Sequence, residues 1–370
     1  MGKAFGIFLV IVIATAGLAY GARVYATHAM SNRAVTPKPL GSTTPASAGL
    51  PFSRVAIESR NRTLIGWWVR ARADSGNVAP AVLFLHGNRS SISDYISLQK
   101  FLYKQGVSSL VFDYSGFGAS GGSASLNNAV SDAGIVARVF EDSAGKNARR
   151  IALGTALGST VLLQAIDSVQ PHVNGVVIEG VAASVRESAV RDGRLPKMLA
   201  PLVEDIGDNV TAAKNVRVPL LAVHSYADNR FPFDDAQRVV AAVPSRTSLV
   251  RHWRKGHSAL LTSTRPCDWA PVLTFVKAGK LPAAKIDSTD ACATQAQVAN
   301  AAASKATVTP AGNAATATGS KSSAKKTPAT KARSTATKAS STATKAPSTK
   351  APATKTKSTP PKKPSATKPR

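Results

Sequence analysis

The sequence predicts an α/β fold in which a mostly parallel β-sheet carries helices on both faces. Short apolar runs alternate with segments whose apolar residues recur at helical spacing, which is the pattern of successive βαβ units. Most of these runs are continuously apolar, as expected of parallel strands that are buried on both faces. The elements lie within residues 52–282, a stretch long enough to bury one sizeable core.

The elements follow one another in a regular order through this domain. Two runs at residues 55–59 and 63–69 predict an opening hairpin, because residues 60–62 form a polar turn between them. The run at residues 79–86 is bounded by proline and glycine, which is typical of a buried parallel strand. Further strands are expected at residues 107–113, 150–154, 173–179, 218–224 and 247–253. Helices are expected at residues 92–105, 126–140, 157–169, 234–242 and 268–278. The interval 181–215 breaks the alternation and predicts a small helical insertion.

An apolar run at residues 4–22 precedes the domain, and its one conspicuous polar residue is Thr15. Its length is about right for one membrane-spanning helix and slightly long for the apolar region of a signal peptide. Residues 1–29 are therefore expected to be an uncleaved anchor or a cleaved signal peptide. Either segment exports the domain, so we expect a membrane-anchored or secreted protein whose domain lies on the extracytoplasmic side, in the periplasm or at the cell surface. Residues 30–51 are rich in Pro, Ser, Thr and Gly and predict a linker.

Charge is concentrated at the other end of the chain. The 370 residues include 47 Lys and Arg against 20 Asp and Glu, a net charge of +27. No acidic residue follows Asp290, whereas 15 Lys and Arg do, and the only large apolar residues there are two valines. Such a composition cannot bury enough apolar surface to fold, so residues 283–370 are predicted to be a disordered basic tail. Outside the membrane, the tail would bind an anionic envelope polymer or lipid head groups, or act as a spacer, and the export signal argues against nucleic acid.

Residues with catalytic chemistry follow the carboxyl ends of the predicted strands, where ligands bind in open α/β sheets. The strand at residues 150–154 ends in Gly154-Thr155-Ala156-Leu157-Gly158 and passes straight into a helix. Asp228 follows a later strand, and His257 follows the last one. An elbow, then Asp, then His is the chain order of the triad in α/β-hydrolases.

The chain resembles the single-anchor α/β-hydrolase-domain proteins, which are related to the serine aminopeptidase and dienelactone hydrolase groups. The resemblance covers residues 52–280 and rests on four motifs: His86-Gly87-Asn88, Asp113-Tyr114-x-Gly116-x-Gly118-x-Ser120-x-Gly122, Asp228, and Gly256-His257. It implies an α/β-hydrolase fold with a small helical cap insertion. It also implies an enzyme of esterase, thioesterase or peptidase type that acts on a small ester-like ligand.

The chain departs from the family at the elbow, where the family pattern is Gly-x-Ser-x-Gly. Ala156 stands at the serine position and has no hydroxyl with which to attack a carbonyl. The remaining catalytic residues are present: Asp228 would orient His257, and the backbone N–H groups of Leu157 and of Asn88 or its neighbour would form the oxyanion hole. Ser159 is the alternative nucleophile, although it lies almost one helical turn past the elbow.

No cofactor and no metal site are predicted. His86 has no second His, Asp or Glu at ligand spacing, so the resemblance assigns it to the oxyanion loop. Two cysteines exclude a disulfide-dense scaffold, and export makes a disulfide between Cys267 and Cys292 the expected state.

The sequence is compatible with three functions. The first is an envelope-anchored hydrolase that is weakly active or inactive because Ala156 replaces the nucleophile. The second is a non-catalytic binding or scaffolding module that the basic tail holds to the envelope. The third is a nucleic-acid-binding protein that acts through the tail, and the apolar N-terminus argues against it.

Overall fold

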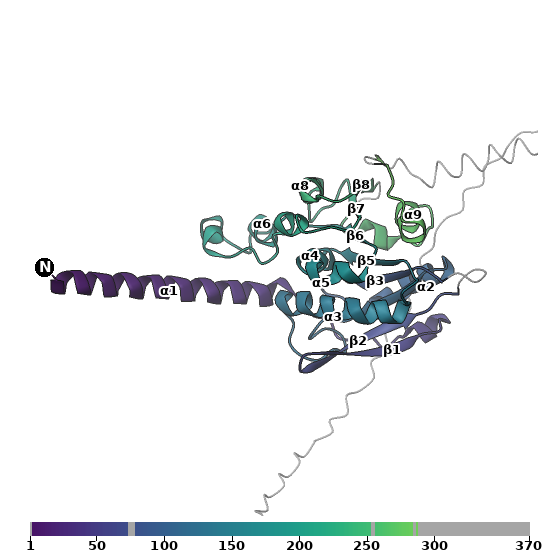
Figure 1. Ribbon diagram of the computed structural model, residues 1–370, viewed down its shortest axis with the longest axis horizontal. Helices are drawn as coiled ribbons and strands as arrows, with labels where there is room; N and C mark the ends of the chain where they lie inside the picture. Colours follow the sequence, from purple (N-terminus) through teal and green to yellow (C-terminus); the bar gives the residue numbers. More distant parts are fainter. Residues whose placement is uncertain (1, 73–77, 253–255, 284–285, 288–370) are drawn as a thin grey trace, which may run out of the picture. The chain divides into compact units, whose positions relative to one another are not determined.

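The fold is a twisted β-sheet between two layers of helices (Figure 1). The computed structural model describes residues 2–72, 78–252, 256–283 and 286–287. The strands are β1 (Ser53–Ser59), β2 (Arg62–Val69), β3 (Ala81–Leu85), β4 (Ser108–Phe112), β5 (Arg150–Thr155), β6 (Gly175–Glu179), β7 (Leu220–Ser225), β8 (Thr247–His252) and β9 (Ile286–Asp287). In the part of the chain that the structure describes, their order is β1-β2-β4-β3-β5-β6-β7-β8-β9. The pairs β1–β2 and β2–β4 are antiparallel and the others are parallel. The predicted α/β-hydrolase fold is confirmed.

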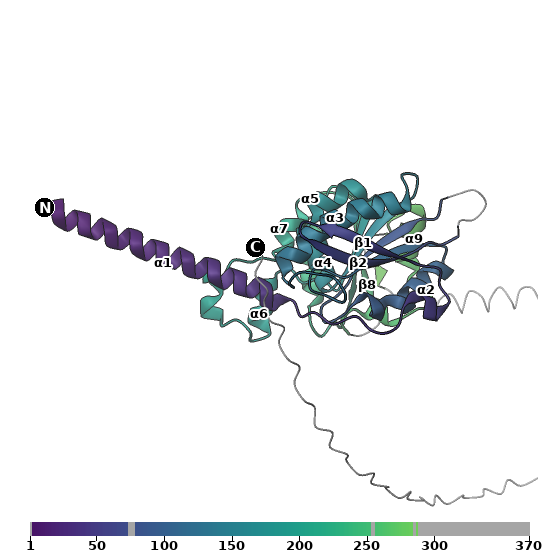
Figure 2. The same cartoon turned by 90° about the horizontal axis from the view of Figure 1, so that it is seen from below.

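The helices cover both faces of this sheet (Figure 2). They are α1 (Gly2–Ala34), α2 (Ile96–Lys104), α3 (Leu126–Ala144), α4 (Leu157–Gln164), α5 (Ile166–Val169), α6 (Val185–Arg191), α7 (Asn209–Ala213), α8 (Phe233–Ala242) and α9 (Ala270–Ala278). Short 3₁₀ helices are η1 (Pro45–Ala48), η2 (Ile92–Tyr95), η3 (Gln170–His172), η4 (Lys197–Leu202) and η5 (Ala259–Thr262). The segment from α6 to α7 is the predicted helical insertion, hereafter the cap.

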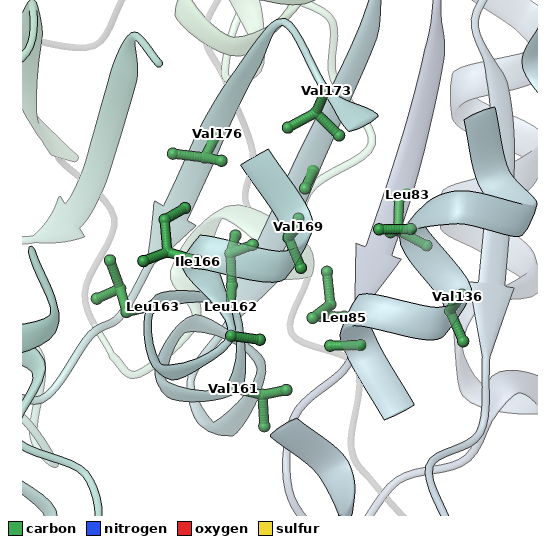
Figure 3. Close-up of a cluster of buried hydrophobic side chains, with 14 of the residues drawn as sticks. Leu83, Leu85, Val136, Val161, Leu162, Leu163, Ile166, Val169, Val173 and Val176 are labelled. Atoms are coloured by element: carbon green, nitrogen blue, oxygen red, sulfur yellow. The ribbon is translucent and has the colours of Figure 1, made fainter. Parts of the chain in front are cut away.

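Two apolar clusters hold the layers together, one on each face of the sheet. Residues of α3, α4, α5 and α8 pack on one face, and residues of α2 and α9 pack on the other. Figure 3 shows part of the first cluster, where Leu83 and Leu85 of β3 lie among Val136 of α3 and Val161 of α4. Consecutive residues of β3 enter opposite clusters and all five are buried, which explains why the strand reads as a continuous apolar run.

The N-terminal region differs from the prediction. Helix α1 continues to Ala34, into residues 30–51 that composition assigns to a linker. The cause is packing: Ser31 and Val35 are buried, and the Ser31 hydroxyl accepts a hydrogen bond from the Asn127 N–H at 3.3 Å. Farther on, Leu50 is buried against the domain. A segment rich in Pro, Ser and Thr is therefore largely ordered here, because tertiary contacts outweigh its weak helical propensity.

The glycine-rich segment after β4 forms a tight turn around the buried side chain of Asp113. The Asp113 carboxylate accepts a hydrogen bond from the Ile92 N–H at 2.9 Å, which fixes the start of η2. Gly118 lies directly against this carboxylate with φ +52°, and a Cβ atom there would lie 1.7 Å from Asp113 Oδ2. Glycine is therefore required by both the backbone conformation and the lack of space.

Gly118→Ala should cost about 3 kcal/mol or more of unfolding free energy, because it adds backbone strain and displaces the buried Asp113 carboxylate. Gly121→Ala is the matched control in the same turn, because a Cβ there meets its nearest atom at an ordinary 3.6 Å. Denaturant unfolding of the full chain in detergent measures both variants. Equal losses in the two would contradict this account.

Candidate functional site

The site is built around the turn between β5 and α4. Ala156 occupies this turn with φ +51° and ψ −110°, a conformation that L-residues rarely adopt. Its N–H donates to the Glu179 carbonyl at 2.9 Å, which ties the turn to β6. Gly158 packs so closely that a Cβ would lie 1.9 Å from the Leu85 carbonyl oxygen. The backbone thus has the strained geometry of a nucleophile elbow, although the side chain at its apex is a methyl group.

Asp228 and His257 come together beside this turn from the ends of β7 and β8. Asp228 Oδ2 accepts a hydrogen bond from His257 Nδ1 at 2.9 Å. The other carboxylate oxygen, Oδ1, accepts from the N–H groups of Arg230 and Phe231 at 2.8 and 2.9 Å. Phe231 also places its ring edge-on to the imidazole, with 5.0 Å between centroids. These contacts fix the orientation of the imidazole and occupy Nδ1. Nε2 is therefore the ring nitrogen that is available to a ligand or a nucleophile.

The environment of Asp228 favours the ionised carboxylate. Burial raises the pKa of this group, but hydrogen bonds from His257, Phe231 and Arg230 outweigh burial and hold the pKa below its ordinary value. A carboxylate fixed in this way stabilises an imidazolium at His257, which is the role of the acid in a catalytic triad.

Asn88 and Leu157, the two expected oxyanion residues, both line the cavity beside Ala156. Leu157 is the first residue of α4, so its N–H has no partner within the helix. The side chain of Asn88 is committed elsewhere: its amide nitrogen donates to the Ala34 carbonyl at 3.0 Å, and its oxygen accepts from the Thr36 N–H at 2.6 Å. Asn88 would therefore serve a ligand through its backbone.

The structure does not bring Ser159 to the site. Its side chain is fully buried, and its hydroxyl donates to the carbonyls of Gly154 and Glu179 at 2.8 and 2.9 Å. The same oxygen accepts from the Glu179 N–H at 3.1 Å. Ser159 therefore joins β5, α4 and β6, and the expectation of an alternative nucleophile at this position does not fit the geometry.

A buried carboxylic acid at the end of β6 is a site residue that the sequence reasoning missed. Glu179 accepts hydrogen bonds from the Thr155 hydroxyl at 2.5 Å and from the Leu260 N–H at 3.3 Å. The Thr155 hydroxyl also lies 3.1 Å from that of Ser258, which follows His257. Burial raises the pKa of Glu179, although these hydrogen bonds and His257 oppose the effect. The sequence contains a signal for this residue, because Glu179 is an acidic residue at the carboxyl end of a predicted buried strand.

His86 is buried, with its Nδ1 2.9 Å from the Gly87 carbonyl, and lies in the loop that carries Asn88. Among the described residues, no group of three or more His, Cys, Asp or Glu is arranged to hold a metal ion. The segment predicted to be a disordered tail starts differently, because Ile286 and Asp287 pair with β8 as strand β9. Cys267 precedes α9, whereas Cys292 and residues 288–370 lie outside the described residues. The disulfide between Cys267 and Cys292 and the partners of the tail therefore stay predictions.

A cavity of about 750 Å³ opens over Ala156 and His257. Its walls come from the loop after β3, the α4 terminus, the cap, the loops after β7 and β8, and the last turns of α1. Most lining side chains are apolar, among them Leu157, Val185, Leu195, Leu199 and Val203. A mostly apolar cavity with a few convergent polar groups is typical of a small-molecule site.

Comparisons with known proteins identify relatives of this chain and of its fold. Residues 76–212 match the family model described as serine aminopeptidase, S33. An uncharacterized protein of Mycobacterium tuberculosis is 30% identical over 200 residues, which cover 53% of this chain and 69% of that protein. An uncharacterized membrane protein of Saccharomyces cerevisiae is 23% identical over 206 residues, covering 55% of this chain and 72% of that protein. An esterase of Pyrococcus furiosus superimposes with a TM-score of 0.52 at 21% identity, covering 65% of this chain and 96% of the esterase, and this likeness concerns the fold.

The stability of the domain should depend on the protonation of Glu179. Its folded pKa lies above the unfolded value, so the stability that it contributes is present at low pH and is lost as pH rises through the folded pKa. Glu179→Gln keeps the shape and removes the charge. Between about pH 5 and about pH 8, the unfolding temperature of the variant should fall less than that of the wild type.

Glu204→Gln, at an exposed position in the cap, is the control and should keep the wild-type pH dependence. Thermal unfolding followed by circular dichroism gives the comparison. Identical pH profiles for the wild type and Glu179→Gln would show that this carboxyl does not titrate as argued.

Proposed function

This chain belongs to the α/β-hydrolase superfamily, and from that premise we propose that it is a membrane-anchored member whose site binds an ester- or amide-type ligand without acyl transfer. One observation carries the proposal: the apex of the elbow is Ala156, held at φ +51°, beside an otherwise complete Asp228–His257 pair. An acyl-enzyme needs a hydroxyl or thiol on that apex, and a methyl group supplies neither.

The groups that remain would still recognise a carbonyl compound. The first N–H of α4 at Leu157 and the backbone at Asn88 line the cavity beside the elbow, where they would donate to a carbonyl oxygen. His257 would offer Nε2 to the other side of the ligand. A carbonyl ligand would therefore be held in place without being attacked by the protein. Turnover would be limited to what a water molecule activated by His257 supplies.

The proposal assigns α1 the role of membrane anchor. Lys3–Ala34 is long and apolar enough to cross a membrane, with a mean hydropathy of 2.2 in its most apolar window. The likeness to a yeast protein that is named a membrane protein supports the same role. We also propose that the domain is exported to the extracytoplasmic side, because the apolar segment at the N-terminus has the properties of an export signal.

Ala156→Ser should restore the missing nucleophile. The serine hydroxyl would attack a carbonyl while His257 removes its proton, so hydrolysis of p-nitrophenyl acetate should rise at least about a hundredfold over a negligible wild-type rate. The variant should also react with a fluorophosphonate probe, which labels activated nucleophiles, whereas the wild type should not.

Two controls make this test specific. Adding His257→Ala to Ala156→Ser should abolish the gain. Ala189→Ser places a hydroxyl in the same cavity from α6, away from the elbow, and should produce no gain. Fluorophosphonate labelling of the wild type at Thr155 or Ser258 would overturn the proposal, as would an Ala156→Ser variant that is folded but inert.

The anchor is tested separately. The full-length chain should remain with the membrane fraction after alkaline carbonate extraction, because a spanning apolar helix is held by the hydrophobic effect rather than by charge. Deletion of residues 4–22 should release it. Recovery of a soluble chain whose N-terminus begins within or after this run would show a cleaved signal peptide instead.

A further inference from the structure

Helix α1 has two parts with different surroundings. Residues 3–25 are exposed along the helix, including Phe5, Ile7 and Ile13, each more than 60% exposed. From residue 26 onward the helix packs on the domain. The exposed part is about 35 Å long at 1.5 Å per residue, close to the roughly 30 Å hydrocarbon thickness of a bilayer. If α1 spans the membrane, the bilayer surface therefore lies near residue 25, where the contact with the domain begins.

The part of α1 that follows this boundary forms a wall of the cavity. Tyr25, Ala26, Ala29, Met30 and Arg33 line the cavity from one side of the helix. Tyr25 lies three residues beyond Ala22, the end of the apolar run, which is about 4.5 Å along the helix axis. The opening of the cavity along α1 would therefore lie at the depth of the bilayer surface.

The cap contributes the opposite wall and an exposed apolar turn. Leu195, Leu199 and Val203 line the cavity, whereas Met198 and Leu202 of η4 are 82% and 62% exposed. Both views show the region of α6 on the side of the domain from which α1 projects (Figures 1 and 2). Exposed apolar side chains next to a spanning helix are suited to the headgroup–acyl boundary of a bilayer.

The charged side chains that line the cavity are basic, and one of them, Arg194, is also paired with Asp192 beside the cavity. Arg33, Arg194 and Arg230 line it, and among the described lining residues there is no Asp or Glu. Guanidinium groups bind phosphate oxygens in a two-pronged geometry, which makes them suited to a phosphate group. An apolar cavity with cationic side chains at its wall matches a molecule that joins acyl chains to an anionic head.

We propose that the cavity takes its ligand from the bilayer, and that the ligand is an anionic phospholipid whose acyl chain enters between α1 and η4. The ester group of the lipid then lies at Ala156, Leu157 and His257, while the phosphate stays near the arginines. This inference rests on the proposed function, because it identifies the carbonyl compound that the site holds. No covalent step is involved.

The test is photo-crosslinking of the full-length protein in phosphatidylcholine vesicles that contain a phosphatidylglycerol probe with a diazirine near the carbonyl end of its acyl chain. Irradiation followed by peptide mapping should place label on the β5–α4 junction and on the cap. Residues 3–24 of α1, which do not line the cavity, should also be labelled because they face lipid, and this label serves as an internal standard for insertion.

Two variants on adjacent turns of α1 make the test selective. Ala29→Trp fills the cavity wall and should lower the cavity label at least tenfold relative to the internal standard. Asn32→Trp adds the same side chain at an exposed position outside the cavity and should leave the label unchanged. If Ala29→Trp does not fold, Leu199→Asp tests the opposite wall, with Val78→Asp at an exposed position as its control.

Each outcome of the crosslinking tests a separate part of the inference. Label on residues 3–24 without label in the cavity would overturn the inference, as would equal cavity label in Ala29→Trp and Asn32→Trp. Equal cavity label from a phosphatidylcholine probe of the same chain would overturn the preference for an anionic head. Because crosslinking needs no nucleophile, cavity label together with an inert Ala156→Ser variant would leave this inference standing and overturn the proposed hydrolase-type site instead.

Discussion

The strand-to-helix turn at Ala156 is the constraint on which the site depends. Its positive φ is held by the Ala156 N–H bond to β6 and by the approach of Gly158 to the Leu85 carbonyl, closer than any side chain would allow. Ser159 adds three hydrogen bonds that join β5, α4 and β6 below the turn. None of these contacts uses the side chain at position 156. The architecture therefore does not require a hydroxyl at position 156, because the strain is sustained by backbone packing.

The other residues of the site are likewise held by contacts that do not involve the side chain at position 156. Asp228 is fixed by backbone N–H groups of its own loop and by His257, and Glu179 holds the loop after β8 through Leu260. Buried polar groups of this kind are costly to leave unpaired, so each stabilises the loops whether or not a substrate is turned over. The Asp228–His257 pair is thus a structural feature as well as a chemical one, and its presence alone does not establish turnover.

A second link joins the site to the N-terminal helix. Asn88, in the loop after β3, donates to the last carbonyl of α1 and accepts from the Thr36 N–H, and the Arg89 N–H donates to the Thr36 carbonyl at 3.0 Å. The loop that is expected to bind a carbonyl oxygen is therefore fastened to the segment that leaves α1. In a membrane-anchored protein this arrangement would fix the distance between the bilayer surface and the site, since a helix is stiff over a few turns.

The sequence by itself determined the α/β alternation, the cap interval, the apolar N-terminal run, and the positions of Ala156, Asp228 and His257, because apolar periodicity and strand-end motifs are local properties of the chain. Only the tertiary structure decided the burial and the hydrogen-bond partners of the residues between these motifs. It extends α1 to Ala34 through contacts with the domain, turns the linker into packed chain, buries Ser159 away from the cavity, and brings Glu179 to Thr155 and Leu260. Those outcomes depend on contacts between residues far apart in the chain, where burial and hydrogen-bond geometry outweigh local propensity.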